Sequence, residues 1–158
     1  MKTSNCILIL CLCLVAAYAL PSLIDTQVHK DIRCLCHAVS GCYFLTNCAK
    51  YSVNYEYWQK AGSPVLSVDQ IPDQKAYRAC ILNNNCVLNT INNYVQAQGE
   101  MDCNCDGDFN AEDMLAIHFG ACQNMSLIPE LARRQWRYNN CAKEKMDMPT
   151  GSCIPDAV

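Results

Sequence analysis

The sequence predicts a single, mainly helical α+β domain that is rich in disulfides and carries one small β-hairpin. Three observations support this fold class. Cysteine is abundant, with 14 in 158 residues. Apolar residues recur at helical spacing over much of the second half of the chain. Aromatic and β-branched residues are frequent instead within 43–58, as in AKYSVNYEYW, which suits a short hairpin.

The first nineteen residues have the organisation of a secretory signal peptide. Lys2 gives a small positive start, residues 6–17 form an apolar run, and Ala17-Tyr18-Ala19 offers an A-x-A cleavage site. The run is too short for a permanent membrane anchor, and no later apolar run is long enough to cross a bilayer. We therefore expect cleavage after Ala19, a secreted and extracellular protein, and no membrane partner.

Cleavage would remove three cysteines and leave an odd number, eleven. In a secreted chain such density indicates a disulfide framework rather than a zinc site. At least one thiol must then be free or bonded to another molecule. We expect a monomer, and a disulfide-linked dimer is the alternative. The connectivity cannot be read from the spacing. The framework cysteines are Cys34, Cys36, Cys42, Cys48, Cys80, Cys86, Cys103, Cys105, Cys122, Cys141 and Cys153.

The charge excludes one class of partner. The formal net charge is −3, and the loss of Lys2 would make it one unit more negative. Nucleic-acid-binding proteins carry a basic stripe or patch, and this sequence has none. The mild acidity also argues weakly against capture of anionic bacterial walls by charge alone.

The remaining elements are assigned from helix caps and breakers. Asp73 can cap one helix, and NNN at 83–85 ends it and lets Asn85 start the next, which runs to Gly99. A short helix at 111–119 ends at Gly120, and a longer one at 128–145 is expected to turn Leu131 and Trp136 inward. The other segments are a lead-in at 20–31, a stapled helical segment at 32–42, a loop at 61–74 and a tail at 146–158. The domain itself is expected at 32–145.

Four motifs occur in an order that is typical of one family: CLCHAVSGC (34–42), CAKYSVNYEYWQKAG (48–62), CILNNNCVLNTINNY (80–94) and DCNCDGDFNAEDMLAIHFGAC (102–122). Over about residues 32–141 the chain resembles the invertebrate-type lysozymes, also called the destabilase family. The resemblance implies a lysozyme-like fold and no cofactor. It also implies a role in defence, and a peptidoglycan or related N-acetylglucosamine-containing glycan as the partner.

Muramidase activity needs two carboxylates, one of which protonates the leaving oxygen. In the family the acid directly precedes S-G-C, and that position is Val39 here. The second carboxylate lies before the next cysteine, where YFLTN (43–47) has none. We therefore expect a glycan-binding protein without muramidase activity. An active lysozyme that uses Glu56 or His37 is the first alternative, and a secreted structural or inhibitory module without glycan binding is the second.

By the same resemblance, five residues are candidates for the glycan-binding cleft: Tyr51, Ser52, Tyr57, Trp58 and His118. The cysteine pattern differs from that of the family, because Asp31 stands where a cysteine is usual and Cys105 appears inside a loop. One interpretation is that Cys105 has taken over the partner of the missing cysteine. Asn124-Met125-Ser126 is a glycosylation sequon.

The stretch DCNCDGDFNAED has the oxygen spacing of an EF-hand-type calcium loop, with Gly107 at the sharp turn. The candidate ligands are Asp102, Asn104, Asp106, Asp108 and Asp113. Position 12 is Asp rather than the longer Glu, and two cysteines lie inside the loop. A disulfide-pinned turn with Asx caps is therefore the favoured interpretation, and calcium binding is the alternative.

Overall fold

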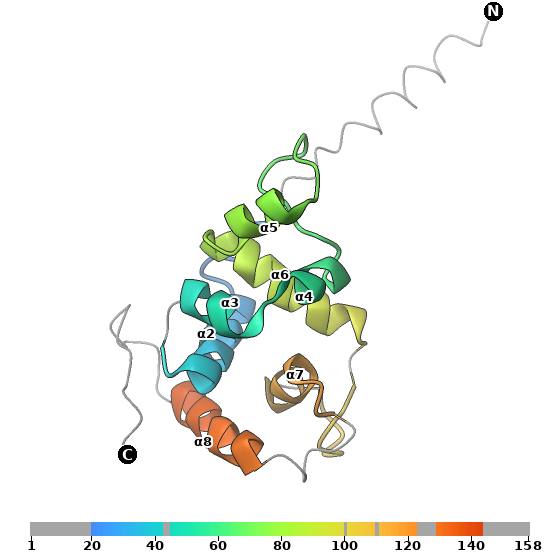
Figure 1. Ribbon diagram of the computed structural model, residues 1–158. Helices are drawn as coiled ribbons and strands as arrows, with labels where there is room; N and C mark the ends of the chain where they lie inside the picture. The colour runs from blue at the N-terminus through green and yellow to red at the C-terminus, as the bar shows by residue number, and fades with distance from the viewer. Residues whose placement is uncertain (1–19, 43–44, 100, 110, 123–128, 144–158) are drawn as a thin grey trace, which may run out of the picture.

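The structure is a computed structural model that describes residues 20–42, 45–99, 101–109, 111–122 and 129–143 (Figure 1). Within these ranges the regular structure is helical, and α2 lies against α3, α6, α7 and α8. None of the described helices is long and apolar enough to span a bilayer. The helices are α2 (Gln27–Ser40), α3 (Leu45–Ser52), α4 (Tyr55–Lys60), α5 (Gln74–Cys80), α6 (Asn84–Ala97), α7 (Ala111–His118) and α8 (Pro129–Lys143).

Helix α2 begins at Gln27, earlier than the stapled segment predicted from the cysteines. The side chain of Thr26 accepts a hydrogen bond from the backbone N–H of His29 and so caps the first turn. At the other end Gly41 adopts a left-handed conformation, with φ 72°, that stops the helix. Ile32, Leu35 and neighbouring residues are buried, so α2 forms one wall of the core.

The predicted β-hairpin is wrong: the described part of 43–58 forms α3 and α4. Burial follows helical spacing, because Leu45, Cys48 and Ala49 face the core. The Cys36–Cys48 disulfide ties this face to α2. A side-chain cap from Asn54 then starts α4. Tertiary packing therefore overrides the β propensity of the aromatic residues.

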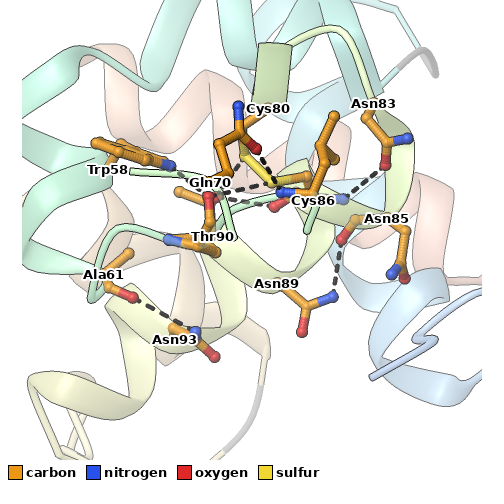
Figure 2. Close-up of a disulfide and its surroundings, with 12 residues drawn as sticks. Trp58, Ala61, Gln70, Cys80, Asn83, Asn85, Cys86, Asn89, Thr90 and Asn93 are labelled. Carbon is orange, nitrogen blue, oxygen red and sulfur yellow. Dashed lines mark hydrogen bonds between the residues drawn. A yellow bond between two sulfur atoms is a disulfide. The ribbon is translucent and has the colours of Figure 1, made fainter. Parts of the chain in front are cut away.

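The predicted helices after residue 73 are confirmed, with small shifts of their ends. Asp73 caps α5, and Asn83, rather than Asn85, caps α6. The Cys80–Cys86 disulfide closes the turn between them, and Thr90 supports it by donating to the carbonyl of Cys86 at 2.8 Å (Figure 2). Trp58 is fully buried beside this turn, where its indole N–H donates to the carbonyl of Pro64 at 2.9 Å.

Helix α8 turns a different face inward from the one predicted. Trp136 is 66% exposed, although the sequence interpretation placed it in the core. Tyr138 and Cys141 are buried instead, and Cys141 is bonded to Cys34 of α2. This disulfide fixes the rotation of α8, and it leaves Trp136 on the solvent side. The side chain of Leu131 lies outside the described residues.

Four disulfides join described cysteines: Cys34–Cys141, Cys36–Cys48, Cys80–Cys86 and Cys103–Cys122. Cys42 is also disulfide-bonded. Among the described residues Cys105 is a free, exposed cysteine, so the interpretation that it replaces a lost bridge partner is wrong. Such a density of bridges is typical of extracellular proteins.

Candidate functional site

A pocket of about 730 Å³ opens where the C-terminal end of α2 meets α3, α8 and the end of α7. Its volume falls within the range of small-molecule sites, roughly 300–1,000 Å³. The described residues that line it are Val39, Ser40, Cys42, Asn47, Ser52, His118, Phe119 and Arg134.

Val39 lies in this lining, so the position at which the resemblance leads us to expect the acid faces the pocket. Among the described residues of the lining there is no Asp and no Glu. Ser40 and Ser52 donate their hydroxyls to backbone carbonyls of their own helices, at 2.8 Å and 2.7 Å. The pocket therefore offers polar contacts but no described carboxylate that could protonate a leaving group.

Arg134 contributes the positive charge of the lining. It reaches the pocket from α8, and its guanidinium carbon lies 4.3 Å from the centre of the Phe119 ring. Such a cation–π contact holds the side chain in place. The pocket thus combines a placed cation with an apolar wall.

His118 and Tyr57 form a buried, neutral pair behind the pocket. The Tyr57 hydroxyl and His118 Nδ1 share a hydrogen bond of 2.8 Å. Burial, and then the charge of Arg134, lowers the pKa of His118 to about 4. Burial raises the pKa of Tyr57, and this ring also stacks on Tyr94. Both groups are uncharged at neutral pH, so His118 adds no charge to the lining.

The two substitute acids lie elsewhere. Glu56 is an exposed residue in the first turn of α4, where Lys60 is 2.9 Å away. The hydrogen bond from Lys60, and then its charge, lowers the pKa of Glu56, whereas a general acid needs a raised pKa. His37 is buried on α2. Neither residue belongs to the described lining of the pocket.

The structure brings together only part of the predicted cleft. Ser52 and His118 line the pocket, while Tyr57 lies behind His118 and Trp58 is buried by the α5–α6 turn. The side chain of Tyr51 is not among those described. The sequence interpretation missed Arg134 and Phe119. Arg134 could have been found from its spacing of four and seven residues from Tyr138 and Cys141 on one helix face.

The acidic loop before α7 uses its oxygens to hold its own backbone. Asp102 accepts hydrogen bonds from the N–H groups of Asp106 and Gly107, and the buried Asp113 accepts from Cys103 at 2.7 Å. The Cys103–Cys122 disulfide pins the loop. Within the described residues no three His, Cys, Asp or Glu side chains come together as a set of metal ligands. The loop can be explained as a turn without a bound ion.

Two of the predicted positions, Asn124 and Cys153, lie outside the residues that the structure describes.

The comparisons with known proteins agree with the motifs. No curated protein sequence and no solved structure matches the chain. A protein-family model described as Destabilase matches residues 29–141, which is more than half of the sequence. The match begins within α2, ends within α8 and includes the described lining of the pocket. The chain therefore belongs to the destabilase family.

Proposed function

We propose that this protein is a secreted, non-catalytic member of the destabilase family that binds peptidoglycan or a related N-acetylglucosamine-containing glycan. The observation that carries the proposal is Val39, which stands at the family's acid position and lines the pocket. The pocket supplies the binding site, and the proposed role is in extracellular defence or in a secretion.

The loss of activity follows from the chemistry of the reaction. A positioned general acid contributes about 10²–10⁴-fold to the rate, and valine has no proton to donate. The second carboxylate of the family has no counterpart in YFLTN at 43–47. These two positions therefore supply neither a group that protonates the leaving oxygen nor a group that stabilises the oxocarbenium centre.

The retained pocket supports glycan binding. Sugar sites commonly pair apolar surface with a few polar groups, and here Val39 and Phe119 lie beside Asn47 and Arg134. Glu56 is an unsuitable replacement acid, because its carboxylate is exposed and its pKa is lowered. His37 is buried away from the described lining.

Retention on an insoluble glycan tests the binding half of the proposal. Purified protein is incubated with insoluble peptidoglycan, chitin or cellulose, and the bound fraction is measured after centrifugation. We expect retention on peptidoglycan, and less retention of a variant whose pocket is narrowed by Ser52→Phe. Arg78→Gln, on α5 and outside the described lining, is the control. If no amino-sugar polymer retains the protein above the cellulose background, the proposal fails and a protein partner becomes the better interpretation.

A further inference from the structure

We propose that the bond between Pro21 and Ser22 is a processing site for a proline-specific dipeptidyl peptidase, and that α6 protects this bond while the N-terminal arm is docked. The arm is residues 20–23, which form the N-terminus after the proposed cleavage at Ala19. Its first two residues are Leu20 and Pro21. Exopeptidases of this class recognise a proline in the second position and release the first two residues together. The arm lies outside the described lining of the pocket, so the proposal does not depend on glycan binding.

Two asparagines of α6 hold the arm by its backbone. The side-chain oxygen of Asn85 accepts a hydrogen bond of 2.9 Å from the N–H of Leu23, and its Nδ2 donates to the carbonyl of Pro21 at 3.1 Å. Asn89 donates to the same carbonyl at 2.9 Å. Asn89 is buried and also donates to the carbonyl of Asn85 at 2.8 Å, which fixes its orientation (Figure 2). Asn85 and Asn89 together form the clamp.

Contacts on both sides of the clamp keep the arm in this position. Leu20 and Leu23 are partly buried against the core. The carbonyl of Leu23 accepts hydrogen bonds from the backbone N–H and the hydroxyl of Thr26, at 3.3 Å and 2.6 Å. The arm therefore continues directly into the capped start of α2. Pro21 and Ser22 are exposed, so the bond between them lies at the surface although its flanks are anchored.

The docked arm lacks the freedom that hydrolysis requires. The reaction adds water across the amide bond, so that the carbonyl of Pro21 becomes a carboxylate and the nitrogen of Ser22 becomes the new α-amino group. A peptidase must donate hydrogen bonds to the oxygen of that carbonyl as negative charge develops on it. Here the two lone pairs of this oxygen already accept from Asn85 and Asn89. The arm must leave α6 before cleavage, so the rate should follow the fraction of chains in which the arm is open.

Cleavage would make this opening permanent. The shortened chain loses the contact of Leu20 with the core and the carbonyl that accepts from both asparagines of the clamp. Of the contacts between the clamp and the arm, it retains the one from the N–H of Leu23 to Asn85. The site therefore converts a local and reversible opening into an irreversible change of the N-terminus.

Treatment of the secreted protein with a purified proline-specific dipeptidyl peptidase tests the proposal. N-terminal sequencing first establishes where the chain begins, and we expect Leu20. Intact-mass spectrometry then follows the loss of one leucine and one proline, and a synthetic peptide of residues 20–29 gives the rate for an undocked arm. The variants are Asn85→Ala, which removes two contacts with the arm, and the matched control Asn84→Ala, at an exposed neighbouring position of α6 outside the clamp.

We expect the protein to be cleaved about tenfold or more slowly than the peptide. Asn85→Ala should increase the rate about fivefold or more, which is the effect of one net hydrogen bond on such an equilibrium, and Asn84→Ala should leave it unchanged. Asn85→Asp retains the acceptor for the N–H of Leu23 and loses the donor to Pro21, so its rate should lie between these two.

Three results would overturn the proposal and leave the proposed function intact. They are an N-terminus other than Leu20, cleavage of the protein as fast as that of the peptide, and equal rates for Asn85→Ala and Asn84→Ala. Tryptic digestion elsewhere in the chain is the control for general unfolding, and it should proceed at the same rate in both variants. If Asn85→Ala accelerates tryptic digestion to the same degree as release of the dipeptide, the clamp has no specific protective role and the proposal also fails.

Discussion

At the scale of single residues, the chemistry of the pocket depends on what stands at position 39. Valine is a weaker helix former than glutamate by less than about 1 kcal/mol, and the caps of α2 at Thr26 and Gly41 do not involve position 39. It removes the one group that can donate a proton at this point of the pocket.

The first prediction concerns Val39→Glu. We expect no release of reducing ends from peptidoglycan by this variant, because the second carboxylate is still missing from 43–47. The rate is measured beside Val39→Gln, which has nearly the same shape and no acid. Turnover by Val39→Glu alone would show that one carboxylate suffices and that the present interpretation of the lost residues is wrong.

The second prediction concerns pH and His118. Its pKa is about 4 in the folded protein and 6.5 in the absence of burial, so between these values the unfolded chain binds a proton that the native state does not. The free energy of unfolding should therefore be undiminished above pH 6.5 and fall as the pH decreases towards 4. This one group can account for a loss of up to about 3 kcal/mol.

Urea unfolding at pH 7.5 and pH 4.5 measures this loss. His118→Gln retains a hydrogen-bonding partner for Tyr57 but cannot titrate, so its stability should decrease less between the two pH values. An equal decrease in both proteins would assign the acid sensitivity to carboxylates instead.

At the scale of elements, the sequence predicts the helices whose caps are contacts between nearby residues. It does not predict the helices that depend on contacts with distant segments. The caps at Asp73 and in the 83–85 stretch are side-chain contacts within a few residues, so the sequence alone predicts α5 and α6. The 43–58 segment has aromatic residues that favour a strand in isolation. Its helices depend on the Cys36–Cys48 disulfide and on packing against α2, which no local pattern contains.

The third prediction concerns the start of α4. Asn54 accepts a hydrogen bond of 2.8 Å from the backbone N–H of Tyr57, so Asn54→Ala should lower the free energy of unfolding by about 1 kcal/mol. Asn84→Ala is the control, because Asn84 is exposed in the first turn of α6 and is not its cap. Chemical denaturation of both variants measures the difference. Equal stability of the two would mean that α4 is held by burial of Tyr57 and Trp58 alone.

At the scale of the whole molecule, the disulfides bring distant segments to the pocket. Cys34–Cys141 joins positions 107 residues apart and places α8, with Arg134, beside the end of α2. The connectivity cannot be derived from spacing. Helical spacing from Tyr138 and Cys141 places Arg134 on the inward face of α8, but only the disulfide shows that this face lies beside Val39, Ser52 and His118. The inward turn of Trp136 was mispredicted for the same reason.

The fourth prediction compares two disulfides. In the loop-closure description, removal of a bridge across about 100 residues costs roughly 4–5 kcal/mol, and a bridge across a few residues costs roughly half of that. The double variant Cys34→Ala/Cys141→Ala should therefore lose more stability than Cys80→Ala/Cys86→Ala, whose cysteines are 6 residues apart. Urea unfolding of the two variants gives the order. The reverse order would mean that local strain or packing outweighs loop closure here.

The release of reducing ends from insoluble peptidoglycan by the purified protein is the most direct measurement of whether this molecule has lost its activity. The assay uses protein in large excess over the amount of an active lysozyme that gives a clear signal. We predict release no greater than that of the heat-inactivated protein, because Val39 replaces the acid and no carboxylate lies in the described lining of the pocket. Sustained release that increases with protein concentration would contradict this, and would require another acid in the cleft.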